Sequence, residues 1–220
     1  MKVYKLYMII ILIFFQGIIT GQVVGRFTQK YNLLINPSLK TYDYRDIEGT
    51  PYLNKDFVDG IIYLKDSTIL KLPLRYNIYA DVMEFQLNGV NYVIGNHSYV
   101  DKITIDTSVF FYYSFIDKGG YFELIESGKC FLVQKSRVIY KPAESPKPIE
   151  NKVIPARFER NSDIFYIVNN SNGFKIKNMN SVLDALQDQK IKIESFIKQE
   201  KIKKTRKTDL VKIVKYYNRL

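Results

Sequence analysis

The dipeptide Asn88-Gly89 constrains the fold of this chain more than any other local feature. It separates two short runs of alternating apolar and polar residues, 83–87 and 90–94. Asn-Gly at such a position favours a type I′ turn, because both central residues of that turn need a positive φ. The sequence therefore predicts a β-hairpin within residues 49–94, and we expect the rest of the chain to extend this sheet or pack on it.

Further runs rich in β-branched and aromatic residues surround the hairpin. The turn dipeptides Asp66-Ser67, Gly119-Gly120 and Ser127-Gly128 separate several of them. We expect strands at 58–64, 69–79, 99–105, 109–116, 121–125 and 129–140, with Pro73 confined to an edge or a bulge. The segments 164–168 and 174–176 flank NNSNG and predict one more hairpin. This spacing is typical of a sandwich, a partial barrel or a large curved sheet.

The segments outside these runs differ in character. Residues 22–48 predict an extended arm with one short strand, and residues 141–155 contain four of the seven prolines, which indicates a surface crossover. After residue 178 the apolar period becomes helical, and we expect helices capped by Ser181, Asp188 and Thr208. Four apolar residues of the last helix fall at i, i+3, i+4 and i+7: Leu210, Ile213, Val214 and Tyr217. The predicted fold class is α+β and β-dominated, an antiparallel meander (22–177) with a small helical cap (178–220).

The N-terminus predicts export. Residues 1–5 (MKVYK) are basic, residues 6–20 are an apolar run, and Gly21-Gln22 follows. This pattern is typical of a secretory signal peptide at 1–21, and a cut after Gly25 is the alternative. The apolar run is shorter than the roughly 20 residues of a spanning helix, so we expect no integral membrane segment after cleavage.

Charge is divided unevenly along the chain. The net charge is +11, yet residues 22–174 hold 18 basic and 17 acidic residues. Residues 175–220 hold 13 basic and 5 acidic residues, and their densest run is Lys198, Lys201, Lys203, Lys204, Arg206 and Lys207. Such runs attract anionic surfaces such as envelope lipid or polysaccharide, or simply form a solvated helix face. Export argues against nucleic acid as a partner.

The sequence contains few of the residues and motifs that common catalytic mechanisms require. His97 is the only histidine and Cys130 the only cysteine, so a zinc site and an internal disulfide are not expected. We interpret His97 as a loop residue and Cys130 as a small buried apolar residue. The sequence contains no nucleophile elbow, P-loop or dinucleotide fingerprint, and we predict no catalytic, metal or cofactor residues and no cofactor.

Two sets of polar residues are candidate functional groups. Carboxylates that a glycosidase could pair are Asp56, Asp59, Asp81, Glu84, Glu123 and Glu126, each of which is more simply explained by a solvated surface role. Arg75, flanked by tyrosines, is the centre of the second group. We expect Arg75 to pair with Glu84 across neighbouring strands, with an anionic ligand at Arg75 as the alternative.

Several stretches resemble a group of uncharacterised exported proteins of Bacteroidota. They are GTPYLNKDFVDG (49–60), LRYNIYADVMEF (74–85), GYFELIESGKCFLV (120–133) and VKYYN (214–218). The resemblance implies a location in the envelope of a diderm bacterium, in the periplasm, at the outer-membrane periphery or outside the cell. It carries no known activity and therefore assigns no functional residue.

These features predict an exported, non-enzymatic envelope protein that binds an envelope protein, lipid or glycan, with an aromatic sheet face as the binding surface. Two alternatives stay open. One is a hydrolase that uses two carboxylates on cell-wall or surface glycans. The other is a periplasmic carrier of lipid or lipoprotein, whose apolar groove would be lined by the aromatic run 109–121.

Overall fold

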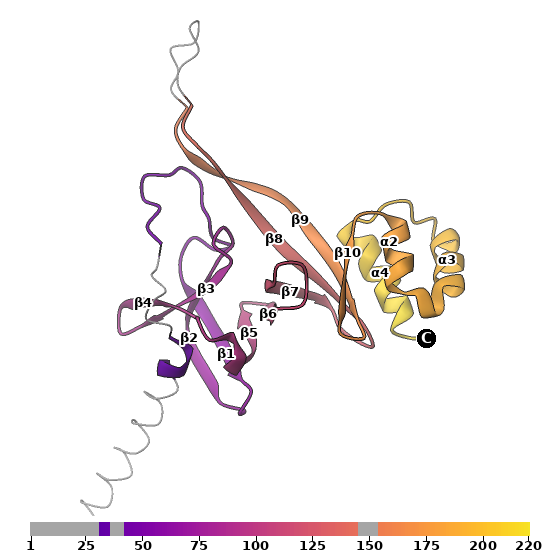
Figure 1. The fold of residues 1–220 in the computed structure, drawn as a ribbon, viewed down its shortest axis with the longest axis horizontal. Coiled ribbons are helices and arrows are strands. Elements are labelled where there is room, and N and C mark those ends of the chain that lie inside the picture. The colour runs from indigo at the N-terminus through magenta and orange to yellow at the C-terminus, as the bar shows by residue number, and fades with distance from the viewer. Residues whose placement is uncertain (1–30, 36–41, 145–153) are drawn as a thin grey trace, which may run out of the picture.

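A computed structural model describes residues 31–35, 42–144 and 154–220 of the chain. One antiparallel sheet of ten strands dominates these residues, in the order β10-β9-β8-β7-β6-β5-β1-β2-β3-β4 (Figure 1). The sheet is open and curved, which confirms the predicted β-dominated α+β class and selects the curved sheet over a sandwich. The predicted signal peptide lies outside the described residues.

The strands follow the predicted runs closely. Their bounds are β1 (Val58–Leu64), β2 (Ile69–Asn77), β3 (Val82–Leu87), β4 (Val90–Val93), β5 (Val100–Ile105), β6 (Ser108–Tyr113), β7 (Gly120–Glu126), β8 (Phe131–Lys141), β9 (Arg157–Asn169) and β10 (Asn172–Ile176). Only β9 differs substantially, because it starts at Arg157 rather than at residue 164. It pairs along nearly all of β8, from Phe131↔Val168 to Lys141↔Arg157, and this long-range partner extends the strand beyond its own apolar run.

The Asn88-Gly89 hairpin forms as predicted. Asn88 and Gly89 have φ values of 51° and 77°, and Leu87 pairs with Val90 across the turn. Pro73 is also where a proline is tolerated. It lies in β2, but β3 pairs only with the stretch from Leu74 to Asn77, so β3 leaves the outer side of Pro73 uncovered.

The chain before β1 differs from the predicted extended arm. Residues 31–34 are helical, and Ile35 forms a single antiparallel bridge with Ile94. Leu34 is fully buried in the apolar cluster on strands β1–β5. This contact explains why the segment packs against the sheet and does not run along the surface as an extended arm. Residues 42–57 then run as a loop along the sheet before β1 begins.

The C-terminal helices are α2 (Met179–Ala185), α3 (Lys190–Gln199) and α4 (Lys207–Tyr217), with a short 3₁₀ turn η2 (Gln187–Gln189) between the first two. The predicted caps were wrong in detail. Asn178 caps α2 and Ser181 closes the capping box as its third residue, while Gln189 and Arg206 precede α3 and α4. The predicted apolar stripe of α4 is confirmed, because all four of its residues are buried.

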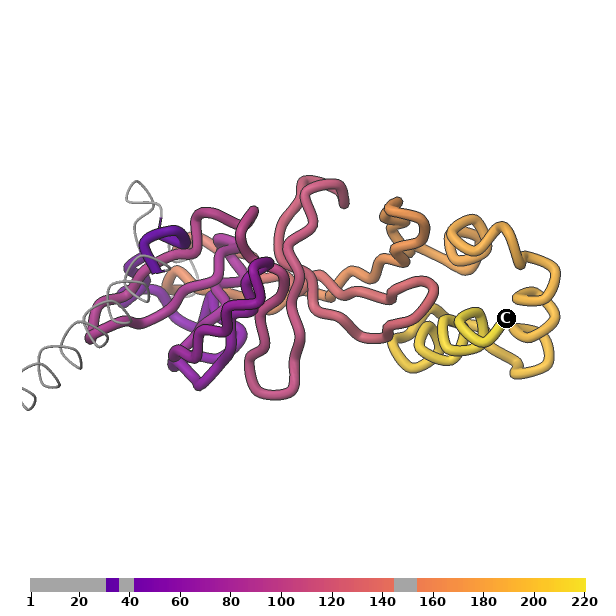
Figure 2. The backbone as a smooth tube through the Cα atoms, turned by 90° about the horizontal axis from the view of Figure 1, so that it is seen from below, coloured from indigo at the N-terminus to yellow at the C-terminus, as the bar shows by residue number. Residues whose placement is uncertain are grey.

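The core is divided between the two ends of the molecule. One apolar cluster fills the curled half made by β1–β5, and another lies between the helices and the strands β8–β10. A small cluster around Phe122 and Tyr166 joins them. Figure 2 shows the helices and the C-terminus at the end opposite to β1–β4. No helix of the described residues is long and apolar enough to cross a membrane.

Candidate functional site

A tyrosine-lined pocket lies where the loop 42–57 crosses the ends of β2 and β3. It has a volume of about 490 Å³, within the range of small-molecule sites. We call it the tyrosine pocket. Its lining residues are Tyr42, Asp43, Tyr44, Arg45, Ile47, Gly49, Thr50, Pro51, Tyr52, Lys55, Asp56 and Arg75.

The loop is held in place by backbone contacts with distant parts of the sheet. The carbonyl oxygen of Pro51 accepts from the amides of Ile78 and Tyr79, and the Glu48 amide donates to the carbonyl oxygen of Ala156. Gly49 sits directly against β9. Its φ is +79°, and a Cβ there would lie 2.5 Å from the carbonyl oxygen of Phe158. Only glycine fits this crossing without displacing the loop.

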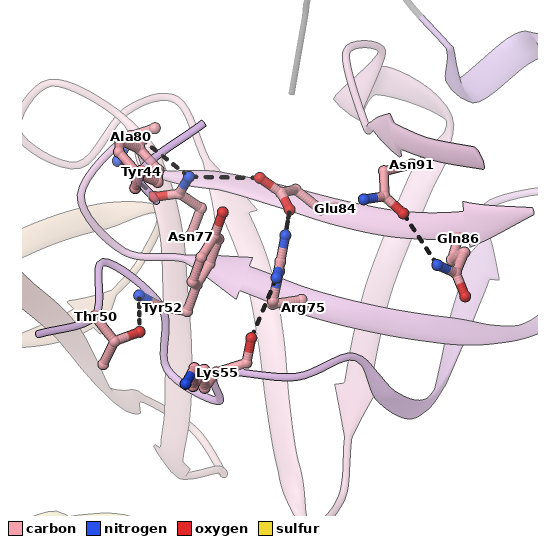
Figure 3. A network of polar contacts seen from close by, with 10 residues as sticks. All are labelled: Tyr44, Thr50, Tyr52, Lys55, Arg75, Asn77, Ala80, Glu84, Gln86 and Asn91. Carbon is pink, nitrogen blue, oxygen red and sulfur yellow. Dashed lines mark hydrogen bonds and ion pairs between the residues drawn. The ribbon is translucent and has the colours of Figure 1, made fainter. Parts of the chain in front are cut away.

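Arg75 lines the pocket and joins the loop to the sheet through the polar network drawn in Figure 3. Its Nε and Nη2 donate to Glu84 Oε2 at 3.1 and 2.6 Å, and its Nη1 donates to the carbonyl oxygen of Lys55 at 3.1 Å. The guanidinium carbon lies 3.7 Å from the ring centroid of Tyr52 and 4.3 Å from that of Phe57. The predicted Arg75–Glu84 pair is therefore present, and it ties the loop to the sheet.

This geometry disfavours Arg75 as a receptor for an anion. Glu84 is fully buried and neutralises the guanidinium, and the two aromatic rings cover its faces. The other oxygen of Glu84 accepts from Asn77 Nδ2 at 3.4 Å. Arg75 thus acts as a positioning residue that orients Tyr52 and the backbone of Lys55.

The tyrosines of the pocket belong to a cluster of packed aromatic rings. The rings of Tyr42 and Tyr44 stack at 5.8 Å with planes 7° apart, and Tyr44 packs edge-on against Tyr52 and Phe158. Tyr42 remains 48% exposed, so it presents a flat apolar surface to a ligand. The stacked rings behind it keep that surface rigid, which lowers the entropic cost of binding.

Hydrogen-bonding groups border this aromatic surface. Asn77 Nδ2 donates to the Tyr44 hydroxyl at 3.3 Å, which leaves the hydroxyl hydrogen to point elsewhere. Burial raises the pKa of Tyr44, and burial together with the charge of Glu84 raises the pKa of Tyr52 to about 12. Both phenols therefore stay protonated donors. The side chains of Arg45, Asp43, Lys55 and Asp56 supply further donors and acceptors.

The charges around the pocket balance. Arg45 forms a bidentate pair with Asp43, with Nη2–Oδ2 at 2.6 Å, and the side-chain hydrogen bond from Arg45 holds the pKa of Asp43 below its usual value. Arg75 is matched by Glu84, and the remaining Lys55 and Asp56 have opposite charge. An uncharged, hydroxyl-rich ligand suits this lining better than an anion.

The predicted carboxylates are not gathered into one site. Asp56 lines the tyrosine pocket and Glu84 lies beneath it, whereas Asp59 lines a separate hollow on β1, β2 and β5 together with Asp106. Glu123 accepts a hydrogen bond from the Ser108 hydroxyl, and Glu126 pairs with Lys215. Asp81 is engaged in a polar cluster elsewhere.

That cluster joins the β2–β3 turn to β7 and β8. Asp81 Oδ1 accepts from the Tyr76 hydroxyl at 2.7 Å, and Asp81 Oδ2 pairs with Lys135 Nζ at 2.5 Å. Lys135 also donates to the carbonyl oxygen of Tyr121, and desolvation lowers its pKa. These contacts fasten the curled half of the sheet to its middle, which is a structural task.

His97 and Cys130 lie apart from the pocket. His97 is the first residue of the 3₁₀ turn η1 (His97–Tyr99), and its ring stacks on that of Tyr112 in β6 with the centroids 3.7 Å apart. Its Nε2 is buried without a partner among the described residues. Cys130 is fully buried beneath α4, and burial raises the pKa of its thiol to about 12, which keeps it an unreactive thiol. Within the described residues no cluster of three or more His, Cys, Asp or Glu is arranged to hold a metal.

The aromatic run at 109–121 divides between core and surface. Phe110 and Tyr121 are buried in the first sheet half, while Tyr112 and Phe115 stay partly exposed. The hollow on β1, β2 and β5 contains Asp59, Lys71 and Asp106 in its lining. None of the residues that line this hollow belongs to the run 109–121.

Sequence reasoning identified Arg75 and Glu84 but missed the tyrosines above them. Tyr42 and Tyr44 fall in the segment expected to be an extended arm. The available signal was the alternation of aromatic and charged residues in Tyr42-Asp43-Tyr44-Arg45, which places two rings on one side of an extended chain.

No model of a known protein family matches the chain, and neither the curated proteins nor the solved structures contain a significant match.

Proposed function

We propose that the protein is an exported, non-enzymatic envelope protein that binds an uncharged glycan in the tyrosine pocket. The observation that carries the proposal is the exposed ring of Tyr42, stacked on Tyr44 at the mouth of a charge-balanced pocket. The C–H face of a sugar ring packs well on the negative face of an aromatic ring. The surrounding phenols and charged side chains can bond the sugar hydroxyls.

Export and the envelope location rest on the N-terminal segment, which has the composition of a signal peptide. A glycan ligand fits such a location, because neutral sugars are abundant on surfaces and in cell walls. The resemblance to exported proteins of Bacteroidota points to the same compartment.

The properties of the pocket favour binding over hydrolysis. A glycosidase needs a carboxylic acid whose pKa is raised so that it can donate a proton. Asp43 has the opposite property, because Arg45 lowers its pKa. Glu84 is fully buried behind Arg75 and cannot reach a sugar in the pocket.

The test is binding of the full chain to an array of neutral and acidic glycans, with Tyr42→Ala as the diagnostic variant. Wild type should bind neutral glycans, and Tyr42→Ala should weaken binding by more than about tenfold, since exposed tyrosines at binding sites are energetic anchors. Tyr99→Ala is the matched control, because Tyr99 is similarly exposed (43%) and lies outside the pocket.

Three results would overturn the proposal. They are equal loss in the two tyrosine variants, binding confined to acidic glycans, and release of new reducing ends on incubation. The last result would instead support the hydrolase alternative. Binding of dispersed lipid with no glycan binding would point to the carrier.

A further inference from the structure

A second hollow lies at the opposite end of the molecule and is lined by basic residues from two separate segments. Lys177 follows β10, whereas Lys203, Lys204 and Arg206 belong to the connection between α3 and α4. Together with Asn178 and Thr205 they border a volume of about 410 Å³. We call this hollow the basic cleft.

The fold holds both sides of the basic cleft in place. The amide of Lys177 donates to Ser181 Oγ, which fixes it to the capping box of α2. On the other side, Ile202 is 9% exposed and packs into the helical core, and its amide donates to the carbonyl oxygen of Ile197. The cations therefore converge because of tertiary packing and not because of their proximity in the sequence.

The positive charge of the basic cleft is not neutralised within the described part of the chain. None of its four cations forms an ion pair there, and its lining contains no acidic residue. Nearby lysines behave differently, since Lys175 pairs with Asp117 and Lys215 with Glu126. All four residues are exposed, so water screens their mutual repulsion, and a bound anion would gain attraction from each of them.

Neutral donors add to the cations. Asn178 Oδ1 accepts from the amide of Ser181, so the amide nitrogen of this side chain is the end available to a ligand. The Thr205 hydroxyl is a further donor. The cleft also adjoins the first residue of α4, whose preceding residue, Arg206, supplies no side-chain cap. The helix dipole at that end favours negative charge, and Asp209 in the first turn of α4 supplies one such charge outside the lining of the cleft.

We propose that the basic cleft binds phosphate groups, presented by an anionic lipid headgroup or by a soluble phosphate compound. Phosphate is the chemistry that fits best, because it is multiply charged and accepts both point-like lysine contacts and the forked contact of arginine. This inference is independent of the glycan proposal, since the tyrosine pocket lies at the other end of the molecule.

The experiment measures two kinds of binding by the full chain. Co-sedimentation uses phosphatidylcholine vesicles with and without phosphatidylglycerol, and calorimetry uses inorganic triphosphate. The diagnostic variant is Lys203→Ala with Lys204→Ala. The charge-matched control is Lys190→Ala with Lys192→Ala, two exposed lysines of α3 outside the cleft. All variants share the apolar N-terminal segment, so only differences between them are interpreted.

Wild type should bind at least one probe, with affinity falling as salt rises. The cleft variant should bind about 30-fold more weakly, since each cation near an anionic surface strengthens association by about fivefold, and the control should change by less than about threefold. Triphosphate binding identifies soluble phosphate as a ligand, and binding to vesicles alone identifies the headgroup. Equal loss in both lysine pairs, or no binding to either probe, would overturn the inference.

Discussion

Arg75 lines the tyrosine pocket, and its fully buried partner Glu84 fixes its position from beneath. Glu84 is 0% exposed and Arg75 only 15% at the side chain. Removing one partner of a buried pair leaves an uncompensated charge. We expect Arg75→Ala to lower the free energy of unfolding by about 3 kcal/mol, as measured by urea denaturation.

The control for this prediction is Arg45→Ala. The Arg45–Asp43 pair has the same 2.6 Å nitrogen–oxygen distance as Arg75–Glu84, but its side chains are 86% and 59% exposed. The urea midpoint of Arg45→Ala should match that of wild type, because exposed pairs contribute little. If the two arginine variants were equally stable, the Arg75–Glu84 pair would not have the anchoring role assigned to it.

The half-buried His97 should make the stability of the protein depend on pH. Burial lowers its pKa, with a smaller opposing effect from Asp81. Below the ordinary histidine pKa of about 6.5, the unfolded chain therefore binds more protons than the folded chain. Stability should consequently fall as pH drops through this window. His97→Phe keeps the stacking on Tyr112 and removes the titration.

Urea denaturation at pH values between about 7 and 5 checks this. Wild type should lose more stability than His97→Phe across the range, since other titrating groups are common to both proteins. Parallel pH profiles would show that His97 is not held in its neutral form by the fold.

The Arg75–Glu84 pairing could be predicted because it depends on the register of one local hairpin. The stacking of His97 on Tyr112 could not, because it joins β6 to the turn η1 that precedes β5. Nothing in the local pattern around His97 indicates that ring as its neighbour.

At the scale of elements, the loop 42–57 depends on its close crossing of β9. Gly49→Ala would place a methyl group 2.5 Å from the carbonyl oxygen of Phe158. We expect this variant to be destabilised and to lose glycan binding, because the loop carrying Tyr42 and Tyr52 must shift. Thermal denaturation and a glycan titration measure the two effects.

Gly89→Ala is the matched control for this crossing. Its φ of +77° nearly equals that of Gly49, but a Cβ at Gly89 meets nothing within 4 Å. Both variants suffer the backbone penalty of about 1 kcal/mol, so any excess in Gly49→Ala measures the contact with β9. Glycan binding should survive in Gly89→Ala, and its loss there would argue against the specific role of the crossing.

Elements that depend on local contacts could be predicted from the sequence, whereas those that depend on long-range contacts could not. The β3–β4 hairpin and the buried stripe of α4 are determined by turn chemistry and local periodicity, and both were predicted. The path of the loop 42–57 depends on contacts such as that between Glu48 and Ala156. Such long-range contacts leave no periodic signal in the loop itself.

At the scale of the whole molecule, the two ends differ in charge and in surface chemistry. Sequence counts alone indicate a neutral body and a basic C-terminal segment. The structure adds that the neutral end contains the tyrosine pocket. At the other end, Lys177, which follows β10, and three cations of the α3–α4 connection line one hollow. The two proposals together assign a glycan to one end of the molecule and phosphate groups to the other.

Calorimetric titration of a neutral glycan into three proteins tests whether the tyrosine pocket is the glycan site: wild type, Tyr42→Ala, and the Lys203→Ala, Lys204→Ala variant. We expect Tyr42→Ala to weaken glycan binding by more than about tenfold and the lysine variant to bind like wild type. Glycan binding that persists in Tyr42→Ala and disappears in the lysine variant would contradict this expectation.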